Sequence, residues 1–258
     1  MAYRVCVLRA PGTNCDAETA WCLQKTGLEA EVVHVNRFID GRADFMGYDG
    51  LVIPGGFSFG DHVRAGALLG KMLKERFYEP LSRFSEEGRP ILGICNGFQI
   101  LVECGLLPGG GMSAALTTNL SSRFEARWVK LRVERENLFT RGMAGSVSLP
   151  VAHGEGRFLM REEEIKALEK RGQVVFRYAF DDGRPAGGAY PANPNGSLHD
   201  IAGISNEAGT VLGLMPHPER AFHRLTHPTW TRERMEEGDA FGEGYMIFRN
   251  MADYIRKR

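Results

Sequence analysis

The sequence of 258 residues predicts an α/β protein with a doubly wound, mostly parallel central sheet that is flanked by helices. In the first half, short β-branched runs that are apolar on both faces alternate with helical stretches, which is typical of buried parallel strands. In the second half, strand-like runs follow one another with a single helical stretch between them. This change predicts a smaller antiparallel β addition to the sheet.

The first half contains four expected strands, at 4–9, 30–35, 50–53 and 90–94. The first expected helix covers about 15–25, with Thr13 or Asn14 as its N-cap. The second begins after Asp61, a plausible N-cap, and continues toward Glu87 with an interruption near Pro80, since proline disrupts a helix interior. The third, at 97–104, follows directly on the fourth strand.

From about residue 127 the expected strands lie at 128–133, 147–151, 174–180, 201–205 and 211–215. A helix is expected at about 161–171, and an amphipathic helix at about 241–256 closes the chain. The chain contains no internal repeat, low-complexity tract or linker-like composition. We therefore expect one domain over 1–258, with an insertion or extension at about 221–243.

Composition limits the classes of function. Apolar residues make up 43% and charged residues 25%, which are ordinary values for a soluble globular protein. Basic and acidic residues number 32 each, so no excess charge suggests nucleic acid or an anionic membrane as partner. There is no membrane-spanning apolar stretch and no signal-peptide pattern, so we expect a cytoplasmic protein. The five cysteines are scattered and odd in number, which predicts reduced thiols and no metal site.

The strongest functional signal is Cys95, in the motif Gly93-Ile94-Cys95-Asn96-Gly97 at the end of the fourth strand. Glycines two positions to either side allow a sharp turn from strand to helix that exposes a nucleophile. A thiol at a helix N-terminus is favoured as thiolate by the helix dipole. We therefore predict that Cys95 is a catalytic nucleophile, and that the other four cysteines are small buried residues.

The expected partners of Cys95 are His217 and Glu219, in His217-Pro218-Glu219. On an extended segment, a spacing of two places both side chains on one face, so Glu219 can orient the imidazole that activates the thiol. Two simpler interpretations compete with this one. His217 could be a structural histidine between two prolines, and Glu219 could form a surface ion pair with Arg220.

Further candidates surround this expected triad. The loop after the third strand faces the elbow, so the N–H of Gly55 or Gly56, of which we favour Gly56, could hold an oxyanion together with the N–H of Asn96. Gln99 lies one helical turn after Cys95, where its amide could bind a polar substrate. For His153, a structural role and substrate contact remain equal alternatives.

These motifs resemble the triad-type (class I) glutamine amidotransferases, a flavodoxin-like fold. Further stretches narrow the resemblance to the glutaminase subunits of phosphoribosylformylglycinamidine synthase, and they lie at 11–16, 54–61, 64–67, 119–124, 152–158, 193–197 and 213–220. The resemblance covers most of the chain. It departs from the family pattern after Arg220, where the segment 221–243 is longer than the usual link.

The resemblance implies a specific set of site residues and partners. Cys95, His217 and Glu219 would form the triad, and Gly56 and Asn96 the oxyanion hole. The residues that would help to hold glutamine are Gln99, Phe57, Asn119 and Ser121. The chain has no Walker-type loop and is expected to bind no cofactor itself. ATP and Mg²⁺ would belong to a large synthetase subunit, accompanied by a small third subunit.

The resemblance implies that glutamine is hydrolysed to glutamate and ammonia through a Cys95 thioester. The ammonia would serve the conversion of formylglycinamide ribonucleotide to formylglycinamidine ribonucleotide in purine biosynthesis. Two alternatives stay open. The chain could be a glutaminase or cysteine hydrolase that serves another acceptor, or a non-catalytic regulatory subunit of the same fold.

Overall fold

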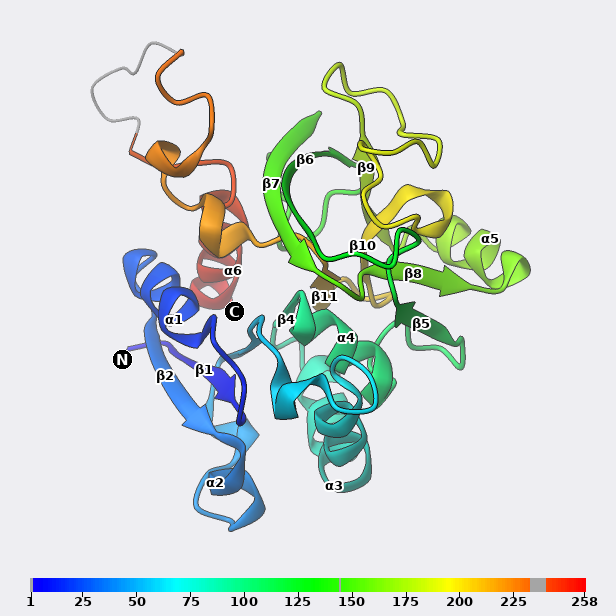
Figure 1. The fold of residues 1–258 in the computed structure, drawn as a ribbon. Helices are drawn as coiled ribbons and strands as arrows, with labels where there is room; N and C mark the ends of the chain where they lie inside the picture. Colours follow the sequence, from blue (N-terminus) through cyan, green and yellow to red (C-terminus); the bar gives the residue numbers. More distant parts are fainter. Residues whose placement is uncertain (1, 144, 233–239) are drawn as a thin grey trace.

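The computed structural model describes residues 2–143, 145–232 and 240–258. Among these residues one large sheet has nine strands in the order β2-β1-β3-β4-β11-β10-β9-β6-β7. A separate pair, β5 (Ala114–Thr117) and β8 (Arg157–Met160), forms a small antiparallel sheet beside it. The α/β class with an antiparallel addition is therefore confirmed, and Figure 1 shows the helices packed around the large sheet.

The first five strands of the large sheet are parallel and follow the flavodoxin-like order. Their bounds are β1 Arg4–Arg9, β2 Glu29–His34, β3 Gly50–Ile53, β4 Ile91–Ile94 and β11 Val211–Leu214. Every residue of β3, β4 and β11 is buried. The carboxyl ends of β3, β4 and β11 lie at one edge, where a site is expected in such sheets.

The antiparallel part continues the same sheet beyond β11. Its strands are β10 Ile201–Ser205, β9 Val174–Ala179, β6 Glu125–Val133 and β7 Ser146–His153, and each pairs antiparallel with its neighbours. In Figure 1, β6 and β7 curve away from the parallel strands. Along β7, buried and half-buried residues alternate, as on a sheet with one covered face.

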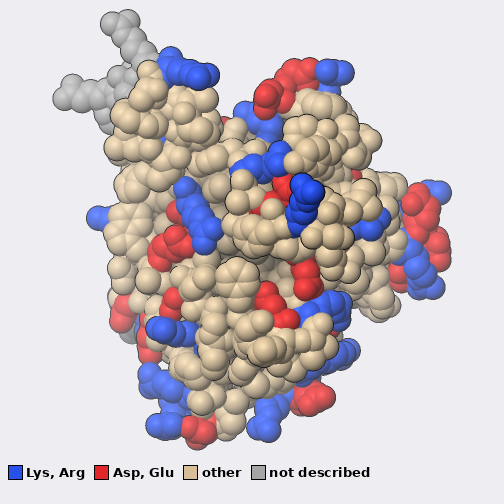
Figure 2. Space-filling model, in the orientation of Figure 1, with Lys and Arg blue, Asp and Glu red and all other residues tan. Residues whose placement is uncertain are grey.

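Two pairs of helices cover the parallel strands. α1 (Asp16–Lys25) and α6 (Tyr245–Lys257) lie on one face, and α3 (Ala67–Glu86) and α4 (Asn96–Cys104) lie on the other (Figure 1). The remaining helices are α2 (Val35–Ile39) and α5 (Glu162–Lys170). None of the helices in the described ranges is long and apolar enough to cross a membrane. On the face in Figure 2, basic and acidic side chains are interspersed, as the balanced composition predicts.

Three helix-boundary predictions are wrong. The N-cap of α1 is Cys15 and not Thr13 or Asn14, because the Thr13 hydroxyl accepts a hydrogen bond from Ala10 N instead. Asp61 does not cap α3, which begins only at Ala67 after a left-handed Gly66. Pro80 does not interrupt α3 either. The helix continues past it because Leu81 and Phe84 are fully buried and hold its last turns on the core.

The predicted insertion at about 221–243 is described in part, since 233–239 lie outside the described residues. Short 3₁₀ turns cover Pro218–Ala221 and Arg224–Thr226, and an isolated bridge pairs His223 with Phe241. The Phe222 ring is fully buried and contacts the rings of Trp21 and Phe248. The start of this segment therefore packs on α1 and α6.

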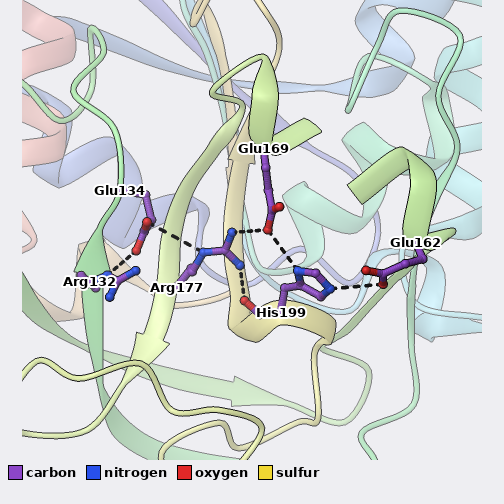
Figure 3. Close-up of polar contacts among 6 residues, drawn as sticks. All are labelled: Arg132, Glu134, Glu162, Glu169, Arg177 and His199. Atoms are coloured by element: carbon purple, nitrogen blue, oxygen red, sulfur yellow. Dashed lines mark hydrogen bonds and ion pairs between the residues drawn. The ribbon is translucent and has the colours of Figure 1, made fainter. Parts of the chain in front are cut away.

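A chain of charged side chains ties the antiparallel strands to α5 (Figure 3). Arg177 of β9 lies between Glu134 and Glu169, at 3.9 Å and 2.6 Å, and also donates to the His199 carbonyl. The His199 ring lies between two carboxylates of α5, with Nδ1 3.0 Å from Glu169 and Nε2 3.2 Å from Glu162. The 198–200 turn is thus joined to both β9 and α5.

Candidate active site

Cys95 occupies the sharp turn between β4 and α4. Its φ is +50° and its ψ is −103°, a conformation that a non-glycine residue adopts only when the surrounding structure enforces it. The turn has no room for larger neighbours. A Cβ on Gly97 would lie 1.8 Å from the Ile53 carbonyl oxygen, and a Cβ on Gly93 would lie 2.7 Å from that of Gly97. The strand-to-helix elbow predicted from the two glycines is present.

His217 and Glu219 follow β11, the strand that pairs with β4. Because Leu214 is in register with Ile94, both strands end at the same level, and Cys95 N donates to the Leu214 carbonyl at 2.8 Å. His217 Nδ1 lies 2.5 Å from Glu219 Oε1. Glu219 lies in the 3₁₀ turn Pro218–Ala221 and not on the extended segment we expected, but the two side chains still meet.

Burial decides between the interpretations of Glu219. Its side chain is fully buried, and its closest approach to Arg220 is 4.0 Å. Arg220 also lies 3.3 Å from Glu18 on α1. The carboxylate is therefore oriented toward the imidazole, and the surface ion pair with Arg220 does not describe it.

The electrostatic environment favours a charged imidazole. Burial alone would lower the pKa of His217, but the negative charge of Glu219 and the neighbouring Cys95 and Cys15 sulfurs outweigh it and hold this pKa well above its ordinary value. Within the described residues, His217 Nε2 has no hydrogen-bond partner. The Cys95 thiol donates to the Ala152 carbonyl at 3.7 Å. This arrangement places a charged imidazole beside the Cys95 sulfur.

The loop after β3 lies against both the histidine and the elbow. A Cβ on Gly55 would lie 2.8 Å from His217 Cε1. Gly56 has a φ of +145°, and Ser58 N donates to the Asn96 side chain at 3.2 Å. The two segments expected to supply oxyanion donors are thus adjacent. The N–H of Asn96, in the first turn of α4, has no carbonyl within its own helix to donate to.

The residues expected to hold glutamine differ in their availability. The Gln99 amide accepts from Asn96 Nδ2 at 2.9 Å and donates to the Glu155 carbonyl, so both of its ends already have protein partners. Asn119 is also fully engaged, since it donates to the carbonyls of Arg123 and His153 and accepts from Gly156 N. Phe57 and Ser121 are exposed.

His153, left open by the sequence, belongs to a buried polar network. Burial, helped by the charge of His217, lowers the pKa of His153 to about 3, so the ring is neutral. Its Nδ1 lies 3.1 Å from Asn119 Oδ1 and its Nε2 lies 3.5 Å from Asn195 Nδ2, which also bonds Tyr178. This network favours the structural alternative for His153.

Sequence reasoning missed Cys15, which it treated as an inert buried residue. In the structure Cys15 Sγ accepts from Arg220 at 3.1 Å, and it lies within 4.8 Å of the nearest ligand atoms of His217 and Glu219. Cys15 N also donates to the Gly55 carbonyl at 3.2 Å. The only available signal was the motif at 11–16, which by itself does not indicate contact with the histidine.

Comparison with known proteins assigns the family. Residues 2–255 match the family described as a CobB/CobQ-like glutamine amidotransferase domain. The chain belongs to the glutamine amidotransferase family. Within it the chain belongs with proteins named phosphoribosylformylglycinamidine synthase subunit PurQ. It is 49% identical to the one from Thermus thermophilus, over 84% of this chain and 89% of that one.

Two further similarities cover nearly the whole chain. The subunit PurQ from Archaeoglobus fulgidus is 42% identical over 98% of this chain and 97% of its own length. A chain of the PurLQS structure from Thermotoga maritima superposes with a TM-score of 0.75 at 33% identity, covering 98% of this chain and 99% of that one. This amidotransferase therefore shares its fold with that chain over nearly the full length of both.

Proposed function

We propose that this chain hydrolyses glutamine to glutamate and ammonia and delivers the ammonia to a synthetase that forms formylglycinamidine ribonucleotide. The observation that carries the proposal is the buried arrangement of Cys95, His217 and Glu219 at the adjacent ends of β4 and β11. The name of the similar proteins, phosphoribosylformylglycinamidine synthase subunit PurQ, supports this acceptor reaction, which we assign to purine biosynthesis.

The proposed chemistry follows from the positions of the three side chains. The Cys95 thiolate attacks the carboxamide carbon of glutamine, and the N–H groups of Gly56 and Asn96 stabilise the oxyanion. The His217 imidazolium, held by Glu219, protonates the departing nitrogen, and ammonia leaves a glutamyl thioester on Cys95. The neutral imidazole then takes a proton from water, which hydrolyses the thioester to glutamate and frees the thiol.

The synthetase half of the reaction belongs to partners in this proposal. The similarity to a chain of the PurLQS structure from T. maritima supports partner subunits. That they are a large synthetase subunit and a small third subunit is part of the proposal. We assign ATP and Mg²⁺ to the large subunit and no cofactor to this chain. The cytoplasmic location expected from the sequence is part of the same proposal.

Partner binding should raise the glutaminase rate. Cys95 and His217 are only 5% and 2% exposed, so glutamine needs an opening movement to reach them. The candidate for this movement is the loop after β3, where the glycine pair Gly55–Gly56 lies against His217. Glutamate release by the isolated chain, and again with the synthetase subunits and their ligands, measures the effect. Full turnover by the isolated chain would contradict gating by partners.

The decisive experiment uses Cys95→Ala in the assembled complex. We expect glutamine-dependent synthesis to be lost and ammonia-dependent synthesis to persist, because Cys95 acts only on ammonia generation. Cys104→Ala, which removes another buried thiol, is the matched control and should retain both activities. Equal loss of both activities in Cys95→Ala would refute the proposed role.

A further inference from the structure

Cys15, His217 and Glu219 form a buried cluster of metal-ligating groups. Their nearest ligand atoms all lie within 4.8 Å of one another. The mechanism above uses the histidine and the glutamate but leaves the Cys15 thiol without a role. We propose that this cluster is a binding site for a thiophilic divalent cation such as Zn²⁺, which reversibly inhibits the enzyme by occupying the histidine.

The geometry places the sulfur on the Glu219 side of the imidazole. The point where a Cβ of residue 55 would lie is 3.1 Å from Cys15 Sγ, 2.8 Å from His217 Cε1 and 3.4 Å from His217 Nδ1. Because residue 55 is glycine, no side chain separates the sulfur from the ring. The Nδ1 edge of His217 faces Glu219, and the Cys15 sulfur lies near both side chains.

An unused donor atom completes the set. Glu219 Oε2 is buried and has no hydrogen-bond partner in the described part of the chain. The present 2.5 Å between Nδ1 and Oε1 is shorter than the distance of about 3.2–3.5 Å between two ligands of one tetrahedral zinc ion. A small rotation of the carboxylate would move Oε1 away and turn Oε2 toward the ion. One thiolate, one imidazole and one carboxylate are ordinary zinc ligands.

Binding would exchange protons for the cation. The Cys15 thiol loses its proton, and so does His217 Nδ1, because a metal ligand must present a free lone pair. The inhibitory consequence rests on the proposed function. With Nδ1 coordinated and Glu219 turned away, His217 can neither be oriented by the carboxylate nor carry the charge of an imidazolium.

The binding test uses Cys95→Ala protein, so that the nucleophile cannot contribute a ligand. Titration with Cd²⁺, followed by thiolate-to-metal absorption, should show one equivalent bound through one sulfur. Adding Cys15→Ala should abolish the absorption. It should also weaken Cd²⁺ binding by more than about 100-fold, which is the most that loss of a group hydrogen-bonded to a metal ligand usually costs. Cys104→Ala in the same background is the matched control and should bind unchanged. Absorption that survives removal of Cys15 would overturn the proposal.

The inhibition test compares each protein with its own rate without metal. Zn²⁺ should inhibit glutamine hydrolysis by the protein without substitutions far more strongly than hydrolysis by the Cys15→Ala or Cys15→Ser variant. Equal inhibition of all three would assign the effect to Cys95 and refute the site. Since the Cd²⁺ titration needs no turnover, failure of the proposed glutaminase function would leave that result intact.

Discussion

The replacement Gly56→Ala tests the proposed oxyanion hole most sharply. With φ at +145°, Gly56 has a backbone conformation that residues with a side chain rarely adopt. An added Cβ would lie 2.7 Å from Asn14 N, 2.9 Å from the Gly12 carbonyl oxygen and 2.9 Å from Thr13 Cα. All three are backbone atoms, so no side-chain rotation relieves the contacts. The loop must move away from the 12–14 segment, and the Gly56 N–H moves with it.

The expected loss follows from what one oxyanion donor contributes. Removing such a donor lowers kcat by about 10²–10³-fold, or about 3–4 kcal/mol. The backbone strain lowers the free energy of unfolding as well, by about 1–3 kcal/mol. Because only ammonia generation uses this donor, ammonia-dependent synthesis by the complex should stay close to the unaltered level.

Gly41→Ala is the control that separates backbone strain from displacement of the loop. Gly41 also has a positive φ, of +67°, but a Cβ there meets nothing within 4 Å. It should lower stability and leave glutamine hydrolysis unchanged. Steady-state assays with glutamine and with ammonia, together with urea unfolding, measure all three quantities. Unchanged glutamine turnover in a folded Gly56→Ala protein would refute the assignment of this N–H to the oxyanion hole.

Three further predictions concern protonation. Glu219→Gln should lower glutamine hydrolysis by about 10²–10⁴-fold, less than loss of Cys95, and shift the alkaline limb of kcat/KM to lower pH, because the carboxylate raises the pKa of His217. The pKa of His153 is about 3 in the folded protein and 6.5 in the unfolded chain, so between these pH values only the unfolded chain is protonated. As the pH drops from 6.5 toward 3, the free energy of unfolding should therefore fall by about 1.4 kcal/mol per pH unit. Burial tends to raise the pKa of Glu169, but the hydrogen bonds from His199 and Arg177 hold this pKa below its ordinary value (Figure 3). Glu169→Gln should therefore lower the free energy of unfolding by up to about 1 kcal/mol at pH 7, and should have no effect below that pKa.

Each of these three predictions has an outcome that would contradict it. An unshifted alkaline limb in Glu219→Gln would mean that the carboxylate does not act on the imidazole. Urea unfolding of His153→Gln between pH 3.5 and 7 should lack the one-proton slope, and an unchanged slope would assign it to another group. A Glu169→Gln penalty that does not shrink as the pH falls through and below the ordinary carboxyl range would show that packing of the side chain, and not its charge, contributes the stability.

The strands and the elbow could be predicted because their signals are local. An apolar run such as 91–94 is buried on both faces, and the glycines that permit the Cys95 turn lie within two residues of it. The missed strands β5 and β8 have four residues each and are only partly buried, so their pattern is too short to stand out. The cap of α3 depends on packing of Gly66 against Gln99, which no local pattern reveals.

The sequence predicted the backbone of the site better than the contacts of its side chains. Spacing alone suggested that His217 and Glu219 meet, and they do. The family resemblance, and not spacing, implied that Asn119 helps to hold glutamine. Its partners His153 and Gly156 come from the end of β7 and the turn after it, more than 30 residues away, where no local pattern reveals them. Cys15 was underestimated for the same reason, because its contact with His217 depends on the pairing of the 12–15 segment with the loop after β3.

The antiparallel strands contribute to the proposed active site and are not only an addition to the sheet. The Pro150 carbonyl of β7 accepts from His217 N at 2.8 Å, and the Ala152 carbonyl of the same strand accepts from the Cys95 thiol. Pro150 and Ala152 point their carbonyls the same way because they are two residues apart on one strand. One edge of β7 therefore positions the backbone of His217 relative to Cys95. The parallel strands carry the side chains that we propose to react, and a strand of the antiparallel half contacts both Cys95 and His217.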